Sequence, residues 1–253
     1  MKKTTTLKPI AKSHKAVVET VKENTSSPGA RRRKALLFQV SVGIMFVAFG
    51  ILTFLVVTIP AFPIDQSITR GLQSINNPIF AGLMTFISWA GFSPQSFILS
   101  AIIVIFLFIL GSYWEGAASL VVAVFVPILN LLVKTLVHRA RPSADLIHIV
   151  NQLNGYSFPS GHVMFYTGFF GFICFLIYTL LKPSWIRTLL LITFGSHIAL
   201  IGISRIYLGD HWASDVLGAY LFGGVCLIAS IFFYRWGKSR FFPNQPTEVV
   251  KEK

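Results

Sequence analysis

Several long apolar segments restrict the folds that are open to this chain. A helix needs about 20 predominantly apolar residues to cross the hydrocarbon core of a bilayer. Six segments reach or approach that length, at residues 36–60, 95–112, 116–137, 162–181, 186–204 and 213–234. We therefore predict an all-α polytopic membrane protein with six transmembrane helices.

The composition agrees with a membrane protein and excludes most soluble classes. Hydrophobic residues make up 54% of the chain and charged residues only 12%, with a mean hydropathy of +0.68. Soluble domains carry about 25% charged residues, so a soluble fold of this size would expose too much apolar surface. A further apolar piece at 79–90 is too short to cross, and we predict an interfacial or re-entrant helix there.

The positive charges indicate the orientation in the membrane. The net charge is +13, and all but five of the 22 Lys and Arg residues lie in the two terminal regions or in the turn at 182–187. Cytoplasmic segments carry an excess of Lys and Arg, so we place both termini in the cytoplasm. The same distribution argues against nucleic-acid binding, because it leaves no soluble basic domain.

These features divide the chain into three predicted parts. Residues 1–34 are expected to form a basic cytoplasmic tail without stable structure, held to anionic lipid headgroups. Residues 35–237 form the six-helix membrane domain, and residues 238–253 form a cytoplasmic C-terminal tail.

The first polar stretch on the predicted outer side runs from Lys134 to Pro142. Lys134 and Arg141 are seven residues apart, so they share one face if the helix continues. Two cations without a nearby carboxylate suit an anionic ligand, since Arg offers a planar fork and Lys a mobile point charge. A basic cap that reaches toward the membrane surface explains the pair equally well.

The second stretch runs from Ser157 to His162 and reads Ser-Phe-Pro-Ser-Gly-His. A helix that begins with Ser160 and Gly161 presents free N–H groups to an anion. His162 at that place could give a proton to a leaving oxygen. An ordinary helix cap beside an interfacial histidine is the alternative.

The third stretch runs from Ser204 to Asp215. His211 and Asp215 are four residues apart and meet on one face of a helix. A carboxylate on one ring nitrogen fixes the tautomer and leaves the other nitrogen free to attack. Arg205 adds a third cation. The alternative is an ion pair that only stabilises a helix end.

Taken together, the three stretches combine charge clamps, a nucleophile with an orienting acid and a proton donor, which is what phosphoryl transfer requires. They also resemble a known family. The patterns Lys-x6-Arg-Pro, Pro-Ser-Gly-His and Ser-Arg-x5-His-x3-Asp match the three-part signature of the type 2 phosphatidic acid phosphatase superfamily, and no motif position departs from it. The resemblance covers about residues 60–235.

The resemblance implies a mechanism and a set of site residues. His211 would be the nucleophile that forms a phospho-histidine, with Asp215 as its orienting partner and His162 as the proton donor. The residues implied to bind the phosphate oxygens are Lys134, Arg141, Ser160, Gly161 and Arg205. The family needs no metal or other cofactor, in keeping with the few carboxylates in these stretches.

Other polar residues are interpreted as structural. We expect Arg139 and Asp145 to belong to a plain loop, and Asp65 and Arg70 to anchor the outer interfacial stretch. The remaining residues interpreted in this way are His138 and His148 at the interface, His197 in the core and Asp210 at a helix end.

We therefore expect a multi-pass lipid phosphatase of the cytoplasmic membrane, with an outward-facing active site at the outer ends of helices three to six. The expected partners are a lipid phosphate substrate and membrane lipids. Candidate substrates are phosphatidylglycerol phosphate, undecaprenyl diphosphate, phosphatidic acid and diacylglycerol diphosphate. The alternatives are a related phosphatase for a soluble phosphate ester, a vanadate-dependent haloperoxidase and a non-enzymatic anion transporter. The sequence leaves the substrate and the oligomeric state open.

Overall fold

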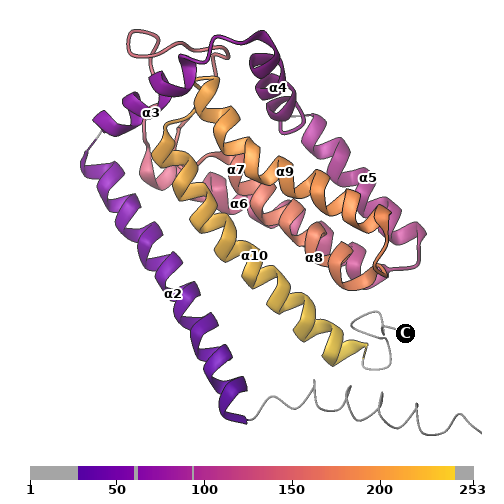
Figure 1. Cartoon of the computed structure of the whole chain (residues 1–253). Coiled ribbons are helices and arrows are strands. Elements are labelled where there is room, and N and C mark those ends of the chain that lie inside the picture. The colour runs from indigo at the N-terminus through magenta and orange to yellow at the C-terminus, as the bar shows by residue number, and fades with distance from the viewer. Residues whose placement is uncertain (1–27, 60–61, 93, 243–253) are drawn as a thin grey trace, which may run out of the picture. The chain divides into compact units, whose positions relative to one another are not determined.

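The computed structural model describes residues 28–59, 62–92 and 94–242, and every regular element in these ranges is helical (Figure 1). This confirms the predicted all-α class. The elements are α2 (Pro28–Thr58), α3 (Pro63–Gln73), α4 (Pro78–Trp89), α5 (Gln95–Ile109), α6 (Tyr113–Val137), α7 (Gly161–Phe165), the π-helical turn η1 (Tyr166–Phe170), α8 (Gly171–Leu180), α9 (Trp185–Tyr207) and α10 (Ala213–Phe241).

Five of the six predicted spans are long and apolar enough to cross a membrane, so the multi-pass character is confirmed. They are Leu36–Thr58, Tyr113–Val137, Gly161–Leu180, Trp185–Tyr207 and Ala213–Phe241. The remaining predicted segment, 95–112, forms α5, which has only 15 residues. Gly111 follows this helix with a φ of 73°, a left-handed conformation that ends helices. The apolar sequence therefore continues for longer than the helix does.

Two predicted boundaries differ from the observed helix ends. Helix α2 already begins at Pro28, where the fixed φ of proline suits the first turn. The rest of the predicted N-terminal tail lies outside the described residues. Helix α10 continues to Phe241, and most of the predicted C-terminal tail lies outside the described residues as well.

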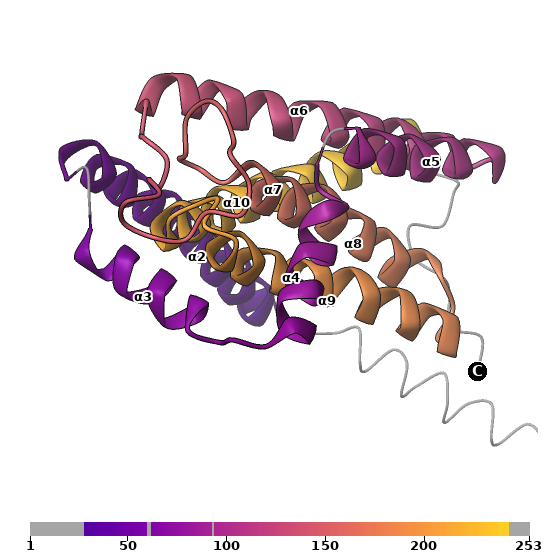
Figure 2. The same cartoon turned by 90° about the horizontal axis from the view of Figure 1, so that it is seen from above.

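The chain divides into two units, Met1–Ile44 and Met45–Lys253. The second unit contains all of the candidate site residues. Within it, α5 lies along α6, α4 packs against α9, and α10 packs against α7 and η1 (Figure 2).

Two short helices precede α5. The predicted interfacial helix at 79–90 is α4, whose start is capped by Asn77: its side-chain oxygen accepts from the amides of Ile79 and Phe80 at 2.8 and 3.1 Å. The place of α4 relative to the membrane stays a prediction. Helix α3 was not predicted. Its isoleucines are exposed whereas Asp65 and Thr69 are buried, and this inverted pattern hides a helix from a search for an apolar core face.

The core of the second unit surrounds the helical run α7–η1–α8, which is the most deeply buried of the candidate spans. Close approach to this run requires small partners. A Cβ on Gly223 of α10 would lie 3.2 Å from the carbonyl oxygen of Met164, which is tighter than ordinary contact. Helices α6, α9 and α10 all contact α7, so the first residues of the run are held in place.

Candidate active site

The candidate site lies where four helix ends meet. Lys134 is in the last turn of α6 and Arg205 in the last turn of α9, whereas His162 is in the first turn of α7 and Asp215 in the first turn of α10. Successive helices run in opposite directions, so these ends fall on one side. His162 interacts electrostatically with Lys134, Arg141, Arg205 and His211. The structure thus brings the three predicted stretches together.

Arg141 reaches this cluster by a different route from the one predicted. Helix α6 ends at Val137, and His138 follows with a φ of 55°. The helix does not continue to Arg141, so Arg141 does not share a helix face with Lys134. The Arg141 Nε donates to the Gly155 carbonyl at 3.1 Å and its Nη1 donates to the Asp210 carbonyl at 2.8 Å. Its Nη1 also lies 3.4 Å from Nε2 of His211.

Lys134 connects α6 to the loop before α7. Its Nζ donates to the carbonyl oxygens of Tyr156 and Ser157 at 2.5 and 3.3 Å. The ammonium group is thereby held beside Ser157 and the buried His211.

The start of α7 presents polar atoms that lack partners. Ser160 is the N-cap residue of α7, yet its side chain makes no capping hydrogen bond. Its Oγ and the Nε2 of His162 are both buried without a hydrogen-bond partner among the described residues. Buried polar atoms are nearly always paired, so these two are candidates for ligand contacts.

Arg205 is completely buried at the end of α9. Its Nη1 donates to the Ser88 hydroxyl of α4 and forms an ion pair with Oδ2 of Asp210 at 2.8 Å. Burial raises the pKa of Asp210, and the charge of Arg205 opposes that shift. The Nε and Nη2 of Arg205 have no hydrogen-bond partner in the described chain. Half of the guanidinium is therefore held by protein, and the other edge is available to an anion.

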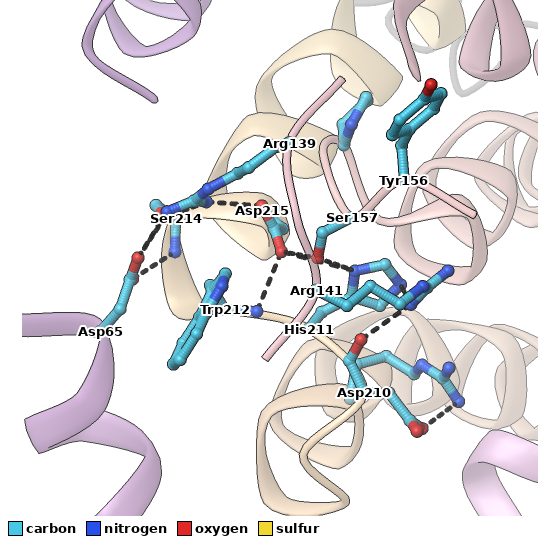
Figure 3. A network of polar contacts seen from close by, with 12 residues as sticks. Asp65, Arg139, Arg141, Tyr156, Ser157, Asp210, His211, Trp212, Ser214 and Asp215 are labelled. Atoms are coloured by element: carbon cyan, nitrogen blue, oxygen red, sulfur yellow. Dashed lines mark hydrogen bonds and ion pairs between the residues drawn. The ribbon is translucent and has the colours of Figure 1, made fainter. Parts of the chain in front are cut away.

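His211 and Asp215 are adjacent, but a third residue stands between them (Figure 3). The Nδ1 of His211 lies 3.5 Å from Oδ2 of Asp215. The Ser157 hydroxyl lies 3.3 Å from the same Nδ1 and donates to the same Oδ2 at 2.5 Å. Ser157 was not predicted as a site residue, although it opens the second stretch. This contact could not be predicted from sequence spacing, because it joins a loop to the start of α10.

The environment of His211 favours its neutral form. Burial lowers the pKa of His211 well below its ordinary value, and the charges of Lys134, Arg205 and Arg141 lower it further. With its Nδ1 directed at Ser157 and Asp215, a proton on Nδ1 leaves the lone pair of Nε2 free. That nitrogen lies beside Arg141, on the side where an anion would bind.

Arg139 and Asp65 also belong to this network, which corrects their interpretation as loop and anchor residues. Arg139 is buried, and its Nη1 contacts Oδ1 of Asp215 at 2.5 Å and Oγ of Ser214 at 2.7 Å. Its Nη2 donates to Oδ2 of Asp65 at 2.9 Å. Sequence spacing could not reveal these contacts, because Asp65 comes from α3, far from Asp215 along the chain.

The turn before α5 forms a wall of the site. The Phe92 ring meets the His162 ring edge-on with centroids 4.7 Å apart, and the guanidinium of Arg205 lies 5.1 Å from the Phe92 centroid. A Cβ on Gly91 would overlap the imidazole of His162. Residues 91 and 92 therefore limit where both side chains can lie.

An apolar cavity of about 760 Å³ extends from this wall between α5 and α6. His162 and Gly161 line one part of it. The residues that line the rest are mostly apolar and include Phe97, Ala101, Val104, Val124 and Ile128. Within the described ranges, three other histidines lie elsewhere: His138 and His148 are exposed, and His197 lies in α9, with its Nδ1 2.9 Å from the Thr193 carbonyl oxygen.

Several known proteins are similar to this chain in sequence and in fold. The family model described as the PAP2 superfamily matches residues 115–240. Phosphatidylglycerophosphatase B of Bacillus subtilis is 33% identical over 182 residues, which are 71% of this chain and 87% of that protein. Lipid A 4'-phosphatase of Bacteroides thetaiotaomicron is 29% identical over 135 residues, or 48% of this chain and 56% of that protein.

Two solved structures are also similar to this chain. The crystal structure of the transmembrane PAP2-type phosphatidylglycerolphosphate phosphatase from Bacillus subtilis is similar with a TM-score of 0.69 and 30% identity, covering 79% of this chain and 98% of that one. Aquifex aeolicus LpxE is similar with a TM-score of 0.53 and 25% identity, covering 69% and 98%. Together with the site geometry, these matches establish that the chain belongs to the PAP2 superfamily and is a membrane lipid phosphatase of that type.

Proposed function

We propose that this protein hydrolyses a lipid phosphate or lipid diphosphate through a phospho-histidine on His211, without a metal ion. The observation that carries the proposal is a set of buried hydrogen-bonding atoms around His211 that have no partner among the residues the structure describes. They include the Nε and Nη2 of Arg205 and the Oγ of Ser160. A phosphate has enough oxygens to satisfy all of these groups at once.

In the first proposed step, the neutral Nε2 of His211 attacks phosphorus and the bond between phosphorus and the ester oxygen breaks. His162 gives its proton to that oxygen, so the lipid alcohol or lipid phosphate leaves with this oxygen protonated. Arg141, Arg205 and Lys134 bind the phosphoryl oxygens, together with Ser160 and the backbone N–H of Gly161. Asp215, acting with Ser157, stabilises the positive charge that develops on the His211 ring.

In the second proposed step, water attacks the phosphorus of the phospho-histidine and the bond between phosphorus and Nε2 breaks. The neutral His162 takes the proton from that water, which restores its starting state. Inorganic phosphate leaves and His211 is again neutral. One histidine therefore acts first as the acid and then as the base.

The apolar cavity between α5 and α6 supports a lipid substrate. It brings an apolar lining directly to His162, so a hydrocarbon tail can lie between the helices while its phosphate meets the cations. A soluble phosphate ester would leave this surface without a function. We expect Val104→Trp to raise the KM for a long-chain lipid phosphate and to leave the KM for p-nitrophenyl phosphate unchanged.

We also propose six crossings with both termini cytoplasmic and the site facing outward. Helix α5 runs from the site end to the opposite end beside α6, and its 15 residues span about 22 Å at 1.5 Å per residue. The distribution of Lys and Arg supports this orientation. A single cysteine at Ser143, in a variant without Cys174 and Cys226, should react with an impermeant thiol reagent on intact cells. Labelling only after lysis would reverse the orientation.

The first substrate to test is phosphatidylglycerol phosphate, because the similar Bacillus subtilis phosphatase and the similar Bacillus subtilis crystal structure are named for that activity. The experiment measures phosphate release by purified protein in detergent with chelator present. The panel contains phosphatidylglycerol phosphate, undecaprenyl diphosphate, phosphatidic acid, diacylglycerol diphosphate and glucose 6-phosphate. Release from one lipid, absent in His211→Ala, supports the proposal. Release from glucose 6-phosphate alone would favour a soluble ester, and no release from any substrate would contradict it.

A further inference from the structure

We propose that Asp65 and Arg139 are positioning residues of the reaction, which hold the Asp215 carboxylate in the orientation that His211 and Ser157 need. Neither residue belongs to the three-part signature. This inference rests on the proposed function, in which Asp215 supports the charge on His211. It concerns a chain of contacts that begins on α3 and ends at the nucleophile (Figure 3).

Arg139 fixes one oxygen of Asp215. Its Nη1 is 2.5 Å from Oδ1 of Asp215, and both side chains are at most 2% exposed. Oδ2 is thereby directed to the reacting side, where it accepts from the Ser157 hydroxyl at 2.5 Å and from the Trp212 amide at 2.9 Å. The two oxygens of Asp215 have separate partners, so rotation of the carboxylate would break contacts on both sides.

Asp65 in turn fixes Arg139. Its Oδ2 accepts from Nη2 of Arg139 at 2.9 Å and from the Ser214 hydroxyl at 2.5 Å, and its Oδ1 accepts from the Ser214 amide at 2.8 Å. Asp65 therefore connects α3 to both Arg139 and the first turn of α10. Because a buried guanidinium with one partner can rotate about that contact, the second carboxylate determines where Nη1 points.

The charges along this chain alternate from Asp65 to Arg139 to Asp215, and His211 lies at the end. Removing Asp65 and removing Arg139 change the charge near His211 in opposite directions. Loss of Arg139 leaves Asp215 uncompensated, which favours the protonated ring. Loss of the charge on Asp65 leaves the positive charge of Arg139 less compensated, which favours the neutral His211 ring. The other charged or titratable groups that face His211 are Lys134 of α6, Arg141 and Asp210 of the loops, His162 of α7 and Arg205 of α9.

A purely structural ion pair would not show this opposition, and the chain provides one for comparison. Glu115 of α6 and Lys238 of α10 pair at 2.6 Å with side chains 5% and 4% exposed, at the opposite ends of those helices from the site. Breaking this pair removes a buried ionic contact on two of the same helices without touching Asp215.

The experiment compares Arg139→Met and Asp65→Asn with the wild type, Arg139→Lys and the control Glu115→Gln. We measure kcat and KM for phosphatidylglycerol phosphate across pH, and we titrate the His211 ring by 15N NMR, with His211→Asn to identify its signal. We expect kcat to fall about 10- to 100-fold in Arg139→Met with little change in KM. Residues that orient a metal ligand through a hydrogen bond cause losses of this size when they are replaced. Asp65→Asn should lose less, and Arg139→Lys should recover part of the loss.

The acid limb of the profile and the His211 titration should move to higher pH in Arg139→Met and to lower pH in Asp65→Asn, by up to about one unit. Glu115→Gln should lower the unfolding temperature but should move neither the acid limb nor the His211 titration. Shifts in the same direction, or no shift in either variant, would overturn the inference even if activity falls. If the wild type releases no phosphate, the proposed function fails, and the NMR titration still decides whether this chain of contacts controls His211.

Discussion

Two buried ionic clusters lie at opposite ends of α6 and α10, and they differ in how completely their polar atoms are paired. At one end, Oε1 of Glu115 accepts from Nζ of Lys238 at 2.6 Å and from the hydroxyl of Tyr234 at 2.8 Å. We call this group the closed cluster. At the other end, buried atoms of Ser160, His162 and Arg205 have no partner among the described residues. We call the group around them the open cluster.

The difference separates a contact made for folding from a site made for a ligand. A buried polar atom without a partner costs about 1–3 kcal/mol of stability. The closed cluster avoids this cost within the protein. The open cluster places several such atoms near His211, whose pKa is lowered. A bound phosphate would satisfy these atoms. Unpaired buried donors are therefore more informative about function here than buried charge as such.

The largest expected effect is loss of the proposed nucleophile in the open cluster. We expect His211→Asn to lower kcat by about 10⁶-fold, as for loss of other catalytic nucleophiles, and to do so equally for lipid substrates and p-nitrophenyl phosphate. Acid-quench trapping with a 32P-labelled substrate should give no phospho-protein in this variant. Labelled protein at wild-type levels would show that another residue is the nucleophile.

A smaller and selective effect is expected from His162→Asn. Loss of the proton donor should lower kcat about 10²- to 10⁴-fold for a lipid phosphate, whose alkoxide leaves poorly. The loss should be much smaller for p-nitrophenyl phosphate, because nitrophenolate leaves without protonation. The measurement is the ratio of the two rates in the variant and the wild type. An equal loss with both substrates would contradict the role of general acid.

Arg205→Lys should lower kcat/KM about 10²- to 10³-fold, because an ammonium cannot contact Ser88, Asp210 and phosphate together. The matched control is Arg187→Lys at the other end of α9, whose guanidinium lies over the Tyr178 ring. The control should keep its activity. A similar loss in both variants would mean that α9 is merely destabilised.

The pH dependence should reveal the cationic surroundings of His211. Because burial and three cations lower its pKa, the free enzyme should keep its nucleophile neutral below about pH 6.5, the ordinary value for histidine. Activity should therefore persist as pH falls through that value, as judged from kcat/KM. Lys134→Met removes one cation, so its acid limb should move to higher pH. A limb that stays in place would show that Lys134 does not act on His211.

The smallest effect on activity is expected in the closed cluster. Glu115→Gln leaves the buried charge of Lys238 without its partner and should destabilise the protein by about 3–5 kcal/mol. Thermal unfolding in detergent measures this loss, and kcat below the unfolding range should be unchanged. A specific loss of kcat would mean that the two clusters are coupled through α6 and α10.

Much of the candidate site could be predicted because its residues occur in three short patterns with fixed spacing. All of the predicted site residues fall between 115 and 240, the range that the family model matches. The residues that were missed or given another role include three from other parts of the chain. Asp65, Ser88 and Phe92 lie outside that range, on α3, α4 and the turn before α5, and their contacts with Arg139, Arg205 and His162 join distant parts of the chain.

Hydrophobic length and local spacing are properties of short segments, so the membrane class, the approximate spans and the residue types of the site could be inferred from the sequence. The folded arrangement was needed to show that Arg141 reaches His211 from a loop, that Ser157 stands between His211 and Asp215, and that Arg139 and Asp65 continue this network. These contacts depend on where helix ends meet. That arrangement follows from packing around the α7–η1–α8 run, and no local pattern encodes it.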